Sequence, residues 1–154
     1  MSIEDDLRDL ARIPLFATLE FEARRQIVFA GETRILRYDD ILFRQGERSD
    51  AGYLLLNGRL EIEAGRGVRG QKVISPPSLI GEMALLTETE RPVTILARAP
   101  STVLKISRLL FHRVLKENPR SAAQVRSLVE LRLRAYSQEL EATRRNNFSD
   151  VVTE

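Results

Sequence analysis

The sequence contains no cysteine, and it has a single histidine, His112. Without cysteine the chain can form no disulfide, no iron–sulfur cluster and no thiolate zinc site, and thiol catalysis is excluded. A zinc or iron site made only of protein ligands usually needs two or three imidazoles, which one histidine cannot supply. We therefore expect no metal, no catalytic residue and no enzymatic activity, and we interpret His112 as an ordinary surface histidine.

Long apolar runs and a clear excess of one charge are also missing. No apolar stretch approaches the roughly 20 residues that span a bilayer, and the acidic start, MSIEDDLRDL, lacks the pattern of a secretory signal. The 24 Lys and Arg residues nearly balance the 22 Asp and Glu residues and lie dispersed along the chain, whereas nucleic-acid binders usually carry a clustered basic excess. We expect a cytoplasmic protein that binds neither DNA nor membranes.

The 154 residues suit one compact domain, which we place at residues 1–145. The pattern over residues 3–12 predicts a short helix with acidic residues in its first turn. A second helix is predicted from Glu20 to Ala30, with Thr18 as its N-terminal cap and Gly31 at its end.

Short strands follow the helices and predict a small β-barrel or sandwich over about 31–107. Turn residues separate the strands, and Asn57-Gly58 is the strongest turn signal because both positions tolerate a positive φ. Residues 65–70, GRGVRG, are predicted to form a hairpin tip. Two helices are then expected over about 108–145, followed by a polar, disordered tail at 146–154.

The stretch 79–94, LIGEMALLTETERPVT, interrupts the strands and carries the groups best suited to an anionic ligand. It predicts one helical turn from Glu82 to Leu86, whose first backbone N–H groups are a natural anion site. Arg91 can donate to two phosphate oxygens, and a buried Glu82 can accept from a sugar hydroxyl. The residues alone leave open a second interpretation, in which Glu82 and Arg91 form an ion pair that braces a loop.

GEMALL, an arginine nine residues after Glu82, and Thr94 three residues further resemble the phosphate-binding cassette of the cyclic-nucleotide-binding domain family. That family includes the catabolite activator protein and the regulatory subunit of protein kinase A. The resemblance covers about residues 13–140. Outside the cassette, the matching positions are Gly46, Asp50, Tyr53 and Gly58.

The resemblance implies an α+β fold, a jelly-roll-like double-stranded β-helix barrel with N-terminal helices and two C-terminal helices. Glu82 would bind the ribose 2′-hydroxyl. Arg91 would bind the cyclic phosphate, helped by the backbone N–H groups of Ala84 and of the residue after Arg91. The full ligand-binding set that it implies is Ile80, Gly81, Glu82, Met83, Ala84, Arg91, Pro92, Val93 and Thr94.

Three positions depart from the family's cassette. Pro92 follows Arg91 directly and has no backbone N–H, so one expected phosphate donor is missing. Glu88 and Glu90 are two acids that could compete for Arg91. Because the family residue linked with guanine preference is a threonine where this chain has Pro92, the resemblance favours cAMP over cGMP as the ligand.

The second C-terminal helix carries a broad apolar stripe that includes Val125 and Val129. A helix that covers only a barrel needs an apolar arc of about 100°, so the breadth indicates a second contact surface, although packing on the barrel alone remains the alternative. The resemblance implies a lid over the base, in which Arg132 or Tyr136 reaches the purine. In some family members the helix, here 120–145, is also a homodimer seam.

These patterns predict a stand-alone regulatory domain that binds a cyclic nucleotide and moves its C-terminal helices toward an unidentified effector protein. No helix-turn-helix, kinase, cyclase or channel segment is recognised in the sequence, so we expect a separate partner to read the signal. The alternative is a degenerate family member without nucleotide binding that serves as a protein-interaction domain, as Pro92, Glu88 and Glu90 would allow. A cupin-like enzyme would need a cluster of histidines, and no cofactor is expected beyond the nucleotide ligand.

Overall fold

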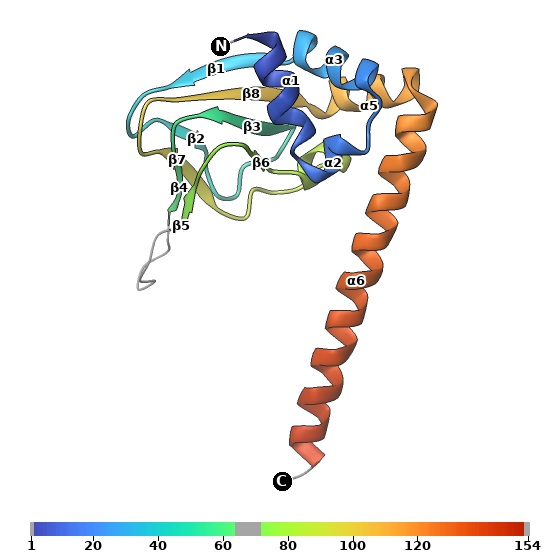
Figure 1. Cartoon of the computed structure of the whole chain (residues 1–154). Coiled ribbons are helices and arrows are strands. Elements are labelled where there is room, and N and C mark those ends of the chain that lie inside the picture. The colour runs from blue at the N-terminus through green and yellow to red at the C-terminus, as the bar shows by residue number, and fades with distance from the viewer. Residues whose placement is uncertain (1, 64–71, 153–154) are drawn as a thin grey trace.

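Figure 1 shows the computed structural model, which describes residues 2–63 and 72–152. Helices lie at both ends of the chain and enclose a region of strands with one short helix inserted between them. The helices are α1 (Ile3–Ala11), α2 (Pro14–Ala17), α3 (Phe21–Ala30), α4 (Met83–Leu86), α5 (Arg108–Glu117) and α6 (Pro119–Val152).

The strands form two antiparallel four-stranded sheets, in the orders β1-β8-β3-β6 and β2-β7-β4-β5. Their bounds are β1 (Glu32–Leu36), β2 (Ile41–Phe43), β3 (Ala51–Asn57), β4 (Leu60–Glu63), β5 (Lys72–Ile74), β6 (Ser78–Ile80), β7 (Thr94–Ala97) and β8 (Ser101–Ser107). The predicted jelly roll is confirmed. It is a sandwich rather than a closed barrel, because no strand pairing in the described chain joins the two sheets.

Side-chain alternation gives β3 and β8 two buried faces. Leu54 and Leu104 point to one face and pack with helices α1, α3 and α5, around Phe16 and Phe111. Their neighbours, such as Leu55, point to the other face and pack between the sheets. Because successive residues of a strand face opposite sides, a strand covered on both sides has the nearly continuous apolar sequence seen in β3.

The turn between β3 and β4 requires glycine. Gly58 has a φ of 97°, and a β-carbon at this position would lie 2.6 Å from the carbonyl oxygen of Pro100. The predicted Asn57-Gly58 turn therefore depends both on the left-handed backbone conformation and on the close approach of the chain before β8. The predicted hairpin tip at 65–70 lies outside the described residues.

Two predicted helix boundaries are wrong. Thr18 does not cap α3, because its hydroxyl donates to the carbonyl of Leu15 at 2.7 Å and ends α2. Glu20 is the residue that precedes α3, and its N–H donates to the hydroxyl of Ser121, on α6, at 2.9 Å.

At the other end of the chain, α6 continues through Val152 instead of ending at residue 145. It begins at Pro119, a first helical position that suits proline because no N–H is needed there. The sequence between Pro119 and Val152 contains no further proline and no glycine that would stop a helix.

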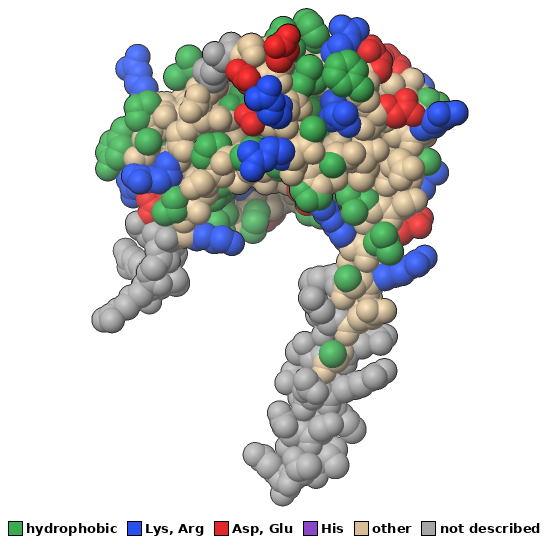
Figure 2. All heavy atoms as spheres, in the orientation of Figure 1, with side chains coloured by type: hydrophobic (Ala, Val, Ile, Leu, Met, Phe, Trp, Pro, Cys, Tyr) green, Lys and Arg blue, Asp and Glu red, His purple; other side chains and the backbone are tan. Residues whose placement is uncertain are grey.

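Helix α6 starts beside α5 and then extends away from the sandwich (Figure 1). Lys, Arg, Asp and Glu side chains are interspersed on the face of the molecule that Figure 2 shows. Within the described residues, no helix is both long enough and apolar enough to cross a membrane.

The edge-to-face contact between Phe16 and Phe111 provides a test of this packing. The ring centroids lie 6.0 Å apart at 85°, and both side chains are fully buried. We expect Phe111→Ala to lower the free energy of unfolding by about 3–5 kcal/mol, because it leaves a cavity under the helices. The matched control is Phe29→Ala, whose side chain is 59% exposed and whose loss should cost about 1 kcal/mol or less. If urea titrations show that Phe111→Ala and Phe29→Ala lower the free energy of unfolding equally, Phe111 is not packed in the core as described.

Candidate functional site

The loop between β6 and β7 forms the helical turn that the sequence predicts. Glu82 precedes α4, and the turn ends at Leu86. The N–H of Ala84 donates to the carbonyl of Gly81, and the N–H of Leu85 donates to that of Glu82, each at 3.0 Å. The Ala84 N–H that the resemblance assigns to a phosphate is therefore already used inside the turn.

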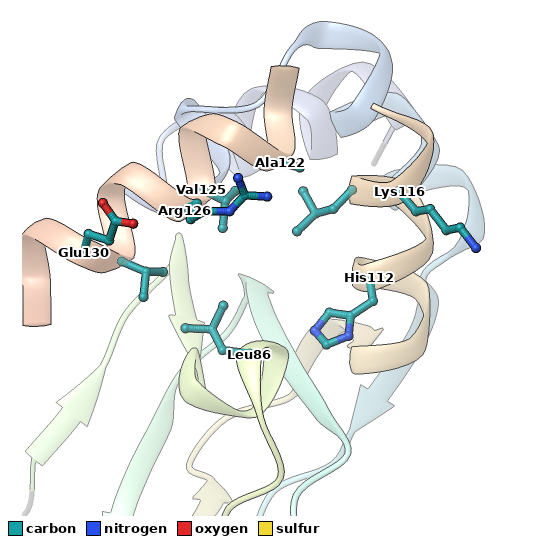
Figure 3. Close-up of a pocket in the computed structure, with 9 residues that line it drawn as sticks. Leu86, His112, Lys116, Ala122, Val125, Arg126 and Glu130 are labelled. Atoms are coloured by element: carbon teal, nitrogen blue, oxygen red, sulfur yellow. The ribbon is translucent and has the colours of Figure 1, made fainter. Parts of the chain in front are cut away.

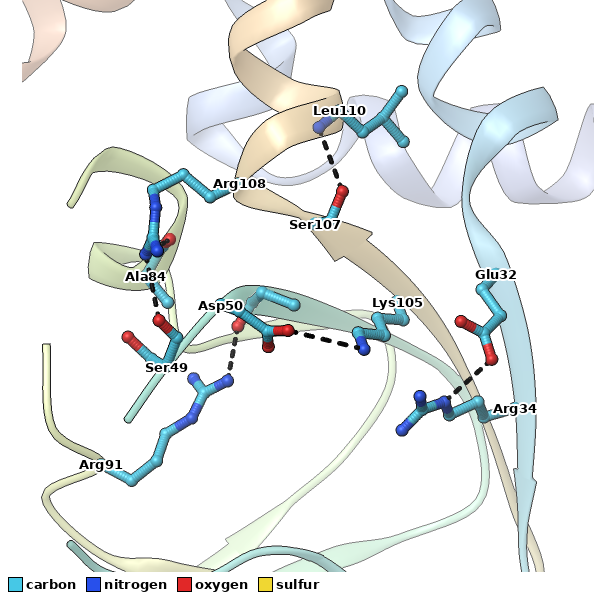
Figure 4. Close-up of polar contacts among 11 residues, drawn as sticks. Glu32, Arg34, Ser49, Asp50, Ala84, Arg91, Lys105, Ser107, Arg108 and Leu110 are labelled. Atoms are coloured by element: carbon cyan, nitrogen blue, oxygen red, sulfur yellow. Dashed lines mark hydrogen bonds and ion pairs between the residues drawn. The ribbon is translucent and has the colours of Figure 1, made fainter. Parts of the chain in front are cut away.

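Arg91, at the far end of this loop, is buried with only 4% of its surface exposed. Its Nη2 donates to the carbonyl oxygen of Ala51, the first residue of β3, at 2.7 Å (Figure 4). The guanidinium carbon lies 4.2 Å from the ring centre of Phe43 and 5.7 Å from that of Tyr53. Strands from both sheets thus hold the cation, through a carbonyl oxygen and two aromatic faces.

The charge of Arg91 has no carboxylate bound to it in the described part of the chain. Burial lowers the pKa of the guanidinium below its ordinary value and the charge of Arg108 adds to that effect, whereas the charges of Asp50 and Glu47 offset part of it. Its Nε is buried and has no hydrogen-bond partner among the described residues. An anion placed beside this group would supply both the missing acceptor and the missing negative charge.

Gly81 makes room for this cation. Its φ is 76°, and a β-carbon at position 81 would lie 2.6 Å from Nη1 of Arg91. Any larger residue would strain the backbone and also push the guanidinium away from Ala51.

Glu82 does not pair with Arg91, so the predicted alternative of a bracing ion pair between them is wrong. Its Oε1 accepts instead from Nη1 of Arg132, which lies fifty residues later on α6. The side chains of Glu82 and Arg132 are 33% and 43% exposed, so a ligand can reach the pair from solvent. Arg132, predicted as a lid residue, thus contacts the predicted ribose-binding carboxylate.

The two acids expected to compete for Arg91 lie elsewhere. Glu88 pairs with Arg48 at 3.4 Å on the exposed surface, and Glu90 forms a backbone bridge with Arg48. The loop is therefore tied to the chain before β3 by these outward-facing contacts. The acids whose charges act on Arg91 are Asp50 and Glu47.

The remaining predicted residues occupy distinct surroundings. Ile80 and Val93 pack in the core between the sheets, whereas Pro92 and Met83 are exposed. The hydroxyl of Thr94 accepts from the N–H of Gln45 at 2.9 Å and so has a structural role.

A hollow of about 450 Å³ separates α4 from α6 next to Glu82. The residues that line it are Glu82, Met83, Leu86, Val129, Arg132 and Leu133. The side chain of Tyr136, the second predicted lid residue, lies outside the described part of the structure.

The sequence prediction missed Arg108, the first residue of α5. Its Nη1 donates to the carbonyl of Ser49 at 3.0 Å and to that of Ala84 at 3.1 Å, as Figure 4 shows. This arginine joins α5 to α4 and to the chain before β3. No local pattern signals it, because both acceptors are backbone carbonyls far away in the sequence.

The family described as cyclic nucleotide-binding domain matches residues 33–118, more than half of the chain. A lysophospholipase nte1 of Neurospora crassa is 32% identical over 115 residues, which are 71% of this chain but only 8% of that protein. The chain therefore spans less than a tenth of the length of such curated relatives.

Two solved structures are similar over most of both chains. A cyclic nucleotide-binding-like protein from Brucella abortus is 32% identical with a TM-score of 0.66, covering 73% of this chain and 98% of its own. The N-terminal domain of a transcriptional regulator from Streptomyces coelicolor is 25% identical with a TM-score of 0.77, covering 85% and 94%.

The role of Gly81 can be tested against Gly46, which has a similar φ of 89° but no atom within 4 Å of the point where a β-carbon would lie. Gly46→Ala should lower the free energy of unfolding by about 1–2 kcal/mol, the cost of the left-handed conformation. Gly81→Ala should cost about 1.5–3 kcal/mol more, because it displaces Arg91 from Ala51. Equal destabilisation of the two variants in denaturant titrations would show that Gly81 does not position Arg91.

Proposed function

The chain belongs to the cyclic nucleotide-binding domain family, and we propose that it binds a cyclic nucleotide with the phosphate at Arg91 and the ribose at Glu82. The observation that carries this proposal is the burial of Arg91 without an acidic partner in the described chain. A buried cation of this kind is costly unless an anion joins it. A cyclic phosphate is a small anion that suits this position.

The ribose assignment is supported by the surroundings of Glu82. A carboxylate offers about four acceptor positions on its two oxygens, so Glu82 can keep Arg132 and still accept from a ribose hydroxyl. The purine would then lie in the hollow between α4 and α6, whose walls include the apolar side chains of Met83, Leu86 and Leu133. We propose cAMP as the ligand in preference to cGMP. In the family a threonine directly after the phosphate-binding arginine is linked with guanine preference, and this chain has Pro92 there instead.

The proposed output of binding is a movement of α6. Arg132 connects this helix to Glu82, so a ligand that engages Glu82 interacts differently with different positions of α6, as a population shift requires. The moved helix would present a new surface to an effector protein, or to a second copy of this chain through residues 120–145. The expected cytoplasmic location is part of the same proposal.

A second candidate function is favoured by two observations. Pro92 has no N–H to offer, and the N–H of Ala84 is used by Gly81. The site thus has fewer backbone donors for a phosphate than the resemblance implies. In this case the domain would act by protein interaction without a nucleotide, and the titration below distinguishes the two functions.

Calorimetric titration with cAMP and cGMP tests the proposal directly. We expect saturable binding of cAMP, and we expect Arg91→Ala to weaken it by about 10- to 100-fold, because a hydrogen bond to a charged group contributes roughly 1.5–3 kcal/mol. Arg44→Ala removes an exposed arginine next to Phe43 and is the matched control, which should bind almost as tightly as the parent.

Circular dichroism should show that both variants remain folded. If Arg91→Ala does not fold, Arg91→Lys replaces it as the test variant. Undisturbed cAMP binding by a folded Arg91→Ala protein would refute the phosphate assignment. No binding by the folded parent protein would support the interaction-domain function.

The ribose assignment predicts that 2′-deoxy-cAMP binds about tenfold more weakly than cAMP, because the deoxy compound lacks the hydroxyl that would donate a hydrogen bond to Glu82. Glu82→Gln should reduce this discrimination, because a neutral amide is a weaker acceptor. Glu88→Gln is the control, since Glu88 pairs with Arg48 at the surface. If Glu82→Gln discriminates between the two nucleotides as strongly as the parent, Glu82 does not bind the 2′-hydroxyl.

A further inference from the structure

A second pocket, of about 430 Å³, lies between α4, α5 and α6 (Figure 3). Its volume is within the roughly 300–1,000 Å³ typical of small-molecule sites. The residues that line it are Leu86, His112, Leu115, Lys116, Ala122, Val125, Arg126, Val129 and Glu130. Arg91 and Glu82 are not among them, so this pocket is separate from the proposed phosphate and ribose positions, although it shares Leu86 and Val129 with the hollow beside Glu82.

The walls of the pocket are largely apolar. Val125 is 4% exposed, and Leu86, Leu115 and Val129 are partly buried against the same helical core. The three helices contribute one wall each, and the side chains of Leu86, Ala122 and Val125, which Figure 3 labels around the opening, have no polar atoms. Such walls bind hydrocarbon by removing it from water.

The polar groups that face the pocket are the guanidinium of Arg126 and the imidazole of His112. Figure 3 shows the guanidinium of Arg126 and the imidazole of His112 directed toward the pocket, whereas the charged ends of Lys116 and Glu130 point away from it. Arg126 takes part in no ion pair with any side chain that the structure describes. An imidazole donates at least one hydrogen bond in either protonation state. The pocket therefore combines an apolar interior with a cationic, hydrogen-bond-donating rim.

We propose that this pocket binds a single-chain amphiphile with one anionic headgroup. The hydrocarbon chain would lie on Leu86, Leu115 and Val125, and the headgroup would bind Arg126 and accept from His112. A cationic amphiphile would meet an uncompensated positive charge at the rim, and a neutral one would leave the arginine without an anion.

The pocket also offers a route to regulation. Leu86 and Val129 form part of its wall and part of the wall of the hollow beside Glu82 and Arg132. If the nucleotide function proposed above holds, an amphiphile that repositions these two residues changes nucleotide affinity, and the nucleotide changes amphiphile affinity by the same factor. Binding of the amphiphile itself does not rest on the nucleotide function.

The test uses decanoate below its micellar concentration, added to the full chain without nucleotide and followed by methyl NMR. We expect saturable shifts at the methyl groups of Leu86, Leu115 and Val125. Decyltrimethylammonium, which has the same hydrocarbon chain but a cationic headgroup, should bind at these methyl groups at least about tenfold more weakly. Decyl phosphate, measured in parallel, distinguishes a phosphate headgroup from a carboxylate by which of the two anions binds more tightly.

Two variants test the residues. Arg126→Ala should weaken decanoate binding by about tenfold, while Arg113→Ala, which removes an exposed arginine of α5 outside the pocket, should not change it. Ala122→Leu should obstruct the pocket and reduce binding, because Ala122 lines this pocket and not the hollow beside Glu82. Circular dichroism checks that each variant is folded.

Equal decanoate affinity in Arg126→Ala and the parent would overturn the headgroup assignment. Equal binding of the cationic and anionic amphiphiles at the same methyl groups would overturn the proposed ligand class. Calorimetric titration of the same sample with cAMP reports separately on the nucleotide function, so failure of one proposal is distinguishable from failure of the other.

Discussion

The buried guanidinium of Arg91 is the constraint on which the site depends. Phe43 comes from one sheet and Tyr53 from the other, and the carbonyl of Ala51, in the same strand as Tyr53, accepts a hydrogen bond from Nη2. Gly81 lacks the β-carbon that would collide with Nη1. A charge so enclosed has no bound carboxylate in the described chain, and a buried charge without a counterion is costly.

Helix α6 contacts the same site from outside the sandwich. Its Arg132 binds Glu82, and its Val125 and Val129 close the second pocket with α5. Both cavities, the hollow beside Glu82 and the second pocket, therefore lie on the side of α6 that faces α4 and α5. A helix that packs over open hollows has fewer fixed contacts than one that fits a closed core. Under the two binding proposals, a ligand in either cavity would favour some positions of α6 over others.

Much of the local structure could be predicted because its causes are local. Asn57-Gly58 forms a turn because glycine accepts a φ of 97°, and GEMALL forms one helical turn because its residues favour helix. The cap at Thr18 was not predictable in this way. A preceding short helix, α2, uses that hydroxyl, and a serine of α6 serves the N–H of Glu20 instead.

The sequence by itself determined the longer helices near both ends, the run of short strands between them, the turn glycines and the residues of the cassette, because each depends on neighbours within a few positions. It did not predict the short helix α2. Only the tertiary structure decided which groups meet. Arg91 donates a hydrogen bond to the carbonyl of Ala51, forty positions earlier. Glu82 pairs with Arg132, fifty positions later, rather than with Arg91, nine positions later. A local pattern shows that a residue is charged and where its backbone turns, but the partner of a side chain depends on how the sheets and α6 pack.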